Sequence, residues 1–290
     1  MQLRVGTYNI AGGKDKTRAE NAARMDRVLT KIADLRGDLL GLVEVMANPP
    51  GADFDTSKLI ASRGLGFSYS CFEASLTADC ATRRPELKAA ASGLYRGNML
   101  LSKYPIVRHH SFLISDLERY GGSRDTEPRH LLLALVELPE GGTLYIGVTH
   151  LHTIEKRNEP AAADVRAIQC RRILAILTGL PHYESSPVLL VGDFNSNPNL
   201  NRAEDREPEI EVLTNELDDL SSDSGPTRER SDPRERIRSV RIDRVFGKRV
   251  RRVGDAYRDR DVFDADSGMF LHDGQSVSDH RPVLVTVETP

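Results

Sequence analysis

Short apolar runs rich in valine, leucine and isoleucine alternate along this chain with longer segments whose apolar residues recur every three or four positions. The first pattern is typical of buried strands and the second of amphipathic helices, so their alternation indicates an α/β architecture. Helices are predicted at residues 19–35 and 161–177. Strands are predicted at residues 3–10, 38–45, 67–72, 97–102, 130–138, 143–150, 188–191, 240–246 and 282–287.

The predicted strands extend from one end of the chain to the other, and no linker rich in proline, serine or glycine separates them. We therefore expect a single domain over residues 1–290. Breaks in the pattern predict loops at residues 47–56, 73–92, 115–128 and 197–209. Residues 227–241 mix arginines with acids, which is usual for solvated surface, although arginines beside a site could also clamp phosphate oxygens.

The charge balance limits the classes of protein that this chain can belong to. Lys and Arg number 40 against 43 Asp and Glu, for a net charge of -3, and 39% of the residues are hydrophobic. These values are ordinary for a globular protein and disfavour a disordered chain or a membrane protein. Because there is no overall basic field, binding of a polyanion would depend on local clusters of Arg and Lys.

The cysteines and the N-terminus carry little sign of special chemistry or targeting. Cys71, Cys80 and Cys170 form no C-x-x-C pair, so we expect buried or idle thiols rather than zinc or redox chemistry. The sequence has no signal-peptide pattern and no apolar stretch near the ~20 residues that span a bilayer. We therefore expect a cytoplasmic protein without a transmembrane segment and without an obligate protein partner.

Polar residues follow the predicted strands at the points where these strands end. The residues concerned are Asn9, Glu44, His150, Asp193 with Asn195, and, near the C-terminus, Asp243 and the pair Asp279–His280. Each alone would also fit a turn or a helix cap. In an α/β sheet, however, functional side chains collect at the carboxyl ends of strands, so the set together predicts one polar cleft.

Glu44 stands out because it interrupts an apolar run between Val43 and Val45. An unpaired carboxylate in a buried run would be costly, and a bound cation would remove that cost. The oxygens of Glu44, Asp279 and the Asn9 amide suit a hard cation such as Mg2+, with Mn2+ as a substitute, whereas zinc prefers nitrogen and sulfur.

These residues belong to an ordered series of short motifs. The motifs are Thr7-Tyr8-Asn9, Leu42-Val43-Glu44, the segment from Tyr95 to Ile106, Thr149-His150-Leu151, Gly192-Asp193-Phe194-Asn195, Arg241-Ile242-Asp243 and Ser278-Asp279-His280-Arg281-Pro282. In order and approximate spacing they resemble the endonuclease/exonuclease/phosphatase family of metal-dependent phosphoester hydrolases over almost the whole chain. The resemblance implies a four-layered α/β sandwich in which two packed mixed β-sheets are flanked by helices.

The resemblance also implies a role for each matching residue. Glu44 would be the main metal ligand, with Asn9 beside it and Asp279 near the metal. Asp193 would orient or deprotonate the attacking water, and Asn195 would hold the phosphoryl group.

The histidines and the remaining matches would act on the phosphoryl oxygens. His280 would donate a hydrogen bond to a nonbridging oxygen while Asp243 orients its ring, and His150 matches a second histidine of the family. Tyr95 and Arg129 match phosphate-contacting positions in some branches. His152 lines the pocket if strand alternation continues past His150, and otherwise lies on a surface loop.

We therefore expect a Mg2+-dependent phosphoester hydrolase, either a phosphodiesterase or a phosphatase. The acidic net charge, the absence of Trp and the aromatic content of 6% favour a small phosphorylated molecule or a lipid head group as substrate. A nuclease acting on DNA or RNA by the same chemistry is the alternative. A binding module that kept the fold and lost the chemistry is less expected, because every motif residue is present.

Overall fold

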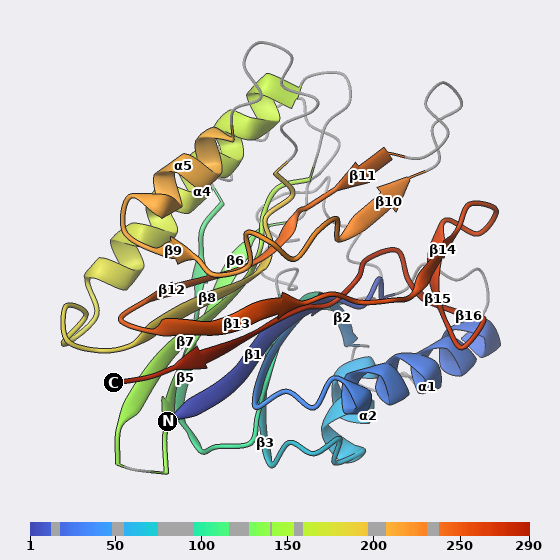
Figure 1. The fold of residues 1–290 in the computed structure, drawn as a ribbon, viewed down its shortest axis with the longest axis horizontal. Helices are drawn as coiled ribbons and strands as arrows, with labels where there is room; N and C mark the ends of the chain where they lie inside the picture. Colours follow the sequence, from blue (N-terminus) through green and yellow to red (C-terminus); the bar gives the residue numbers. More distant parts are fainter. Residues whose placement is uncertain are drawn as a thin grey trace.

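Two mixed β-sheets pack face to face between helices in the computed structural model of this chain (Figure 1). The structure describes residues 1–12, 18–47, 55–74, 95–115, 128–139, 141–153, 159–196, 207–230 and 238–290. The helices of this part are α1 (Arg18–Asp34), α2 (Thr56–Ser62), α4 (Glu159–Thr178) and α5 (Pro208–Thr214).

The strands of the described part are numbered in chain order. They are β1 (Gln2–Asn9), β2 (Leu39–Ala47), β3 (Tyr69–Ala74), β4 (Tyr95–Ser102), β5 (Ile106–Leu113), β6 (His130–Glu137), β7 (Thr143–His150), β8 (Val188–Asp193), β9 (Asp218–Asp219), β10 (Arg228–Arg230), β11 (Arg238–Val240), β12 (Asp243–Lys248), β13 (Arg251–Tyr257), β14 (Val262–Asp264), β15 (Met269–His272), β16 (Gln275–Ser278) and β17 (Val283–Glu288).

The strand order places the motif-bearing strands at the centre of each sheet. The first sheet has the order β13-β17-β1-β2-β4-β3, and the second has the order β5-β6-β7-β8-β12-β9. The pairs β1–β2 and β7–β8 are parallel, whereas β1–β17 and β8–β12 are antiparallel. Two smaller sheets, β10-β11 and β14-β15-β16, lie toward the right of Figure 1, away from the two termini.

Three hydrophobic clusters hold the layers together. A central cluster between the two sheets includes Val43, Ile146 and Val191. A second cluster joins α1 and α2 to the outer face of the first sheet, and a third joins α4 and α5 to the outer face of the second sheet (Figure 1). Because both faces of each sheet are covered, its central strands are continuous apolar runs. The predicted four-layered α/β sandwich is confirmed.

Most predicted elements are present, but one predicted strand was wrong. Residues 240–246 were expected to form one strand, whereas β11 ends at Val240 and β12 begins at Asp243. The Thr227 hydroxyl oxygen accepts hydrogen bonds from the backbone N–H groups of Ile242 (3.0 Å) and Asp243 (3.1 Å), so the chain turns here instead of continuing one ladder. The elements that no pattern predicted are α2, α5, β5, β9, β10 and β13 to β16.

The predicted loops coincide largely with residues outside the described part of the chain. This holds for most of residues 47–56, 73–92 and 115–128. The predicted loop at 197–209 ends too late, because α5 begins at Pro208. Cys71 and Cys170 are free and buried as expected, whereas Cys80 lies outside the described residues. No helix in the described ranges is long and apolar enough to cross a membrane.

Candidate active site

The polar strand ends meet where the two sheets face each other. Asn9 ends β1, and the parallel pairing of β7 with β8 sets His150 beside Asp193. The antiparallel pairing of β12 with β8 places Asp243 directly opposite Asp193. Because β1 contacts β8 and β12 across the interface, side chains from both sheets converge at this end of the sandwich.

Glu44 reaches the site from a bulge in β2. The pairing of β2 with β4 shifts register between Leu42 and Val45, and Glu44 has a φ of 57°, which is rare for a residue other than glycine. The Gly12 N–H donates to the Glu44 carbonyl oxygen (3.1 Å), and a Cβ on Gly12 would lie 2.1 Å from that oxygen. Such strain costs on the order of 1–3 kcal/mol and is typical of functional positions.

A glycine also determines the position of Asp193. Gly192 has a φ of 152°, and a Cβ there would lie 1.8 Å from the Thr149 carbonyl oxygen, so only glycine lets β8 approach β7 this closely. Beyond it the chain turns at Asn195 (φ 48°), whose N–H donates to Asp193 Oδ1 (2.9 Å). Asn195 Nδ2 donates to the Leu151 carbonyl oxygen (3.2 Å), and its Oδ1 is buried without a hydrogen-bond partner within the described residues.

Asn9 connects the carboxylates of the two sheets. Its Nδ2 donates to Glu44 Oε1 (3.2 Å) and to Asp193 Oδ2 (3.0 Å), while its Oδ1 accepts from the Ala11 N–H (3.0 Å). The Ala11 bond fixes which side of the amide faces the carboxylates. In this conformation Asn9 donates through its nitrogen, whereas the sequence predicts that its oxygen binds the metal.

Asp243 and His280 form a buried pair. His280 Nδ1 lies 2.8 Å from Asp243 Oδ2, and His280 Nε2 lies 3.8 Å from Asp193 Oδ2. Ser278 supports the histidine, because its Oγ donates to the Asn9 carbonyl oxygen (2.6 Å) and accepts from the His280 N–H (3.1 Å). Asn9 Nδ2 lies 3.5 Å from His280 Nε2, so the imidazole is contacted from both sheets.

The environment moves the pKa values of three of these groups apart. Burial raises the pKa of Asp193 to about 6, and the nearby Asp243 charge adds to the increase. Burial alone would lower the pKa of His280, but the Asp243 and Asp279 charges outweigh it and the net pKa is raised. Burial lowers the pKa of His150 well below its usual value, and the Arg129 charge acts in the same direction.

The site contains a group that could hold a metal ion. One ligand atom each of Asp193, Asp243 and His280 lies within 4.8 Å of the others, and all three residues are buried. Glu44 adds a further carboxylate to this group, because it accepts a hydrogen bond from the same Asn9 amide that donates to Asp193. A site rich in carboxylate oxygens fits a divalent cation of the Mg2+ type.

The remaining predicted residues lie in different surroundings. Arg129 is buried, and its backbone N–H donates to Ser115 Oγ (2.7 Å). Its positive charge contributes to the lowered pKa of His150. His152 is buried and its backbone N–H donates to Gln169 Oε1 (2.9 Å), so this histidine is not exposed on a surface loop. The Tyr95 side chain lies outside the described part of the chain.

Asp279 has a partner that no sequence pattern predicts. Arg228 Nη2 donates to Asp279 Oδ2 at 2.9 Å, and Arg228 belongs to the mixed-charge segment expected to be solvated surface. No signal in that run distinguished Arg228 from its neighbours, because only the pairing of distant strands brings it to the site.

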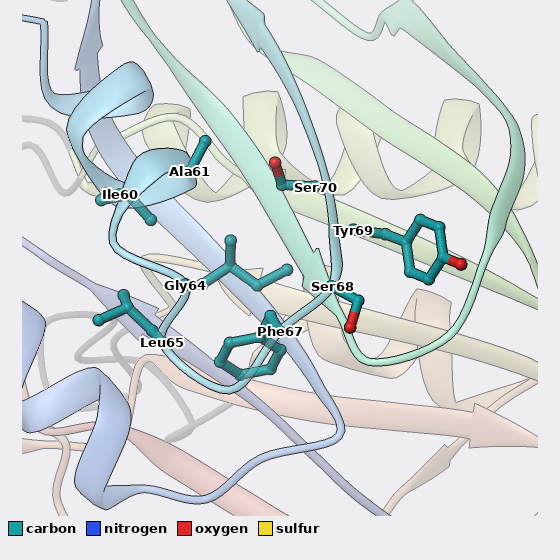
Figure 2. A pocket seen from close by; sticks show the side chains of 9 residues that line it. Ile60, Ala61, Gly64, Leu65, Phe67, Ser68, Tyr69 and Ser70 are labelled. Carbon is teal, nitrogen blue, oxygen red and sulfur yellow. The ribbon is translucent and has the colours of Figure 1, made fainter.

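A small cavity lies elsewhere, between α2 and β3. It has a volume of about 30 Å³ and is lined by Ile60, Ala61, Gly64, Leu65, Phe67, Ser68, Tyr69, Ser70 and Leu101 (Figure 2). This volume holds roughly one or two water molecules, and none of the lining residues belongs to the site described above. The cavity is too small for a phosphorylated ligand and is separate from the candidate active site.

Comparisons with known proteins found a family model and solved structures that match this chain. A model of the Endonuclease/Exonuclease/phosphatase family matches residues 6–280. A search of curated proteins found no significant match. Among solved structures, an endonuclease/exonuclease/phosphatase from Beutenbergia cavernae DSM 12333 has 20% identity and a TM-score of 0.68, covering 99% of this chain and 72% of that chain.

Two further solved structures share the fold. The human Nocturnin catalytic domain with bound sulfate anion has 20% identity and a TM-score of 0.66, covering 100% of this chain and 94% of that chain. A humanized D. rerio TDP2 has 16% identity and a TM-score of 0.62, covering 99% of each chain. At these identities the likeness establishes the architecture alone.

Proposed function

Because the chain belongs to the endonuclease/exonuclease/phosphatase family of metal-dependent phosphoester hydrolases, we propose that it is a Mg2+-dependent phosphodiesterase or phosphatase acting on a small phosphorylated molecule or a lipid head group. One observation carries the proposal. The Asn9 amide links the carboxylates of Glu44 and Asp193 across the two sheets, beside the buried Asp243–His280 pair. This arrangement provides a metal ligand, a general base and a hydrogen-bond donor in one place.

Glu44 is the proposed main ligand of Mg2+. Asn9 holds the Glu44 carboxylate through Nδ2, and Asp279 is the proposed neighbour of the metal, with its Oδ1 3.9 Å from His280 Nε2. The bound cation would neutralise a phosphoryl oxygen and stabilise the leaving oxygen of an in-line displacement.

Asp193 is the proposed base for the attacking water. A pKa of about 6 leaves it ionised at neutral pH and basic enough to accept a proton. The Asn9 amide and the Asn195 N–H each hold one of its oxygens, so the carboxylate cannot rotate freely. The water oxygen bonds to phosphorus, its proton passes to Asp193, the ester P–O bond breaks, and the leaving oxygen takes a proton from solvent.

His280, His150 and Asn195 are the proposed donors to the phosphoryl group. The raised pKa of His280 favours its charged form, which donates as negative charge accumulates on the nonbridging oxygens. His150, whose pKa is lowered, is neutral at pH 7 and donates one N–H without adding charge. Arg129 and Tyr95 complete the proposed phosphate-binding set.

Charge supports the choice of a small substrate. With a net charge of -3 the chain has no general attraction for a polyanion, so a nucleic acid would be bound by local cations alone. Nocturnin was solved with a bound sulfate, an anion that resembles a single phosphoryl group. Hydrolysis of DNA or RNA is the alternative outcome of the experiment below.

The test compares substrates and variants at fixed Mg2+. We expect hydrolysis of nucleotides or detached lipid head groups to exceed that of plasmid DNA and of a single-stranded oligonucleotide. EDTA, Glu44→Ala and His280→Ala should each abolish it, whereas Glu184→Ala and His110→Ala, which change exposed residues of the same types, should not. Activity that survives all three treatments contradicts the mechanism, and rapid nicking of plasmid at low enzyme concentration contradicts the choice of substrate.

A further inference from the structure

Arg228 occupies a fixed position beside the candidate active site. It begins β10, forms an isolated antiparallel bridge with His280, and pairs with Val240 of β11. The neighbouring Thr227 carbonyl oxygen accepts from the Arg281 N–H at 2.7 Å. The Arg228 backbone therefore cannot move without displacing the segment that carries His280.

Only some of the hydrogen-bond donors of the Arg228 side chain have an acceptor within the described residues. Its Nη2 donates to Asp279 Oδ2 (2.9 Å), and the two side chains are 13% and 10% exposed. Its Nε is buried and has no hydrogen-bond partner within the described residues. A buried guanidinium donor without an acceptor is costly. The Nε groups of Arg244 and Arg281 are in the same state, so what distinguishes Arg228 is its position beside His280 and Asp279.

The charge of Arg228 acts on the centre of the site. Burial raises the pKa of Asp193, and the Arg228 charge opposes that increase. Burial lowers the pKa of His150, and the Arg228 charge adds to the decrease. The Arg228 charge thus acts on the proposed base and on a proposed phosphoryl donor, and its Nη2 contacts Asp279.

We infer that Arg228 is a phosphate-binding residue, with Asp279 as the residue that positions it. The Arg228 Nε donor has no acceptor within the described residues, so it can donate a charge-assisted hydrogen bond to a phosphoryl oxygen. Asp279 accepts from the neighbouring Nη2, so its carboxylate is already neutralised by a cation of the chain itself. The inference rests on the proposed function, because it assigns a further ligand to the same phosphoryl group.

This arrangement changes the role of Asp279. The family resemblance places Asp279 near the metal, whereas its ion pair with Arg228 makes it the residue that holds this guanidinium.

The experiment measures binding of inorganic phosphate in the presence of Mg2+, by calorimetry or phosphorus NMR, together with Mg2+ affinity and hydrolysis. Arg228→Gln should weaken phosphate binding about 10- to 100-fold and raise KM, because one charge-assisted contact is lost. Arg228→Lys should retain part of the affinity, and added guanidinium should partly rescue Arg228→Ala. Mg2+ affinity should change less than threefold in all of these variants.

Arg252→Gln is the matched control, because Arg252 makes a bidentate ion pair with Asp223 (2.7 and 2.8 Å) outside the site. It should leave phosphate binding unchanged. Should Arg228→Gln fail to fold, Arg228→Lys and its thermal unfolding midpoint serve in its place. Unchanged phosphate affinity in a folded Arg228 variant overturns the inference, as does loss of Mg2+ binding in Asp279→Asn while phosphate affinity is retained.

The two proposals can fail separately. If the wild-type protein hydrolyses phosphoesters and Arg228→Gln does so equally well, the proposed function stands and the role of Arg228 is wrong. If phosphate binding depends on Arg228 but the wild-type protein hydrolyses no phosphoester, the role of Arg228 stands and the proposed function is wrong.

Discussion

The amide nitrogen of Asn9 lies 3.0 Å from Asp193 Oδ2, and so joins the first sheet to the proposed base on the second. The same nitrogen holds Glu44, while the amide oxygen is engaged by the Ala11 N–H. Asn9 is therefore a donor shared by two carboxylates in this conformation. The proposed role of Asn9 as a metal ligand can be tested against this donor role.

Asn9→Asp should separate the two roles. A carboxylate at this position would repel Glu44 and Asp193 and remove the shared donor, so we expect kcat to fall about 10²- to 10³-fold without tighter Mg2+ binding. Steady-state kinetics and a Mg2+ titration provide the measurement. Asn215→Asp, the same change at an exposed residue after α5, is the control. Retained activity with higher Mg2+ affinity would show that the oxygen of Asn9 binds the metal.

The two site histidines should titrate on opposite sides of the ordinary histidine pKa of 6.5. In metal-free protein we expect His150 to stay neutral well below pH 6.5 because it is buried near Arg129, and His280 to stay charged above it because Asp243 and Asp279 outweigh its burial. Imidazole nitrogen NMR across a pH series would follow both rings.

A variant extends this prediction to stability. The raised pKa of His280 means that its contribution to stability is fully present below pH 6.5 and is lost as pH rises through the folded-state pKa. Asp243→Asn removes the main charge that raises it, so the His280 pKa should fall, the contribution to stability should become smaller, and its loss should be complete at a lower pH. Asp223→Asn, which changes the partner of Arg252, should leave both histidines unchanged. A His280 pKa unaffected by Asp243→Asn would exclude the pair as the cause.

Gly192 should tolerate no side chain. Because a Cβ would meet the Thr149 carbonyl oxygen at 1.8 Å, Gly192→Ala must push β8 from β7 and displace Asp193. We expect the free energy of unfolding to fall by about 2 kcal/mol or more, measured by urea denaturation, with loss of activity. Gly142→Ala, where a Cβ meets nothing within 4 Å, should change stability by less than about 0.5 kcal/mol. Equal effects at the two glycines would contradict the steric argument.

The sequence predicted those parts of the fold that are buried on both sides. Strands such as β8 (Val188–Asp193) are continuous apolar runs, whereas β5 (Ile106–Leu113) is an edge strand whose Arg108 and His109 are exposed, so its pattern does not distinguish it from a loop. The short helices α2 and α5 have seven residues each, too few for a helical period to be evident.

The identity of the site residues was easier to predict than their orientation. Asp193 and His150 end strands, and the topology of an α/β fold is enough to bring them together. The bulge at Glu44 cannot be predicted from the sequence, because the part of β2 that follows Glu44 contains no glycine or proline. The donor role of Asn9 depends on the Ala11 N–H, and the position of Arg228 depends on its bridge to His280, both of which are set by the folded backbone.

Arg24 should be a structural support for the whole site. This buried arginine of α1 donates to the carbonyl oxygens of Ile10 (2.9 Å), Ala11 (3.0 Å) and Val277 (2.8 Å). It thereby joins the chain that follows Asn9 to the strand that precedes Asp279 and His280. Arg24→Met would leave three buried carbonyl groups without this donor, so we expect a loss of about 3–5 kcal/mol in the free energy of unfolding.

The matched control is Arg63→Met, because Arg63 makes an exposed ion pair with Asp26 at 3.2 Å. Such surface pairs contribute little, so this variant should differ from wild type by less than about 1 kcal/mol in urea denaturation. Arg24→Lys should be intermediate, since one ammonium group cannot reach all three carbonyls in the geometry of a planar fork. If Arg24→Met is as stable as Arg63→Met, the three hydrogen bonds do not hold the two segments together, and the alignment of Asn9 with His280 must come from the sheet alone.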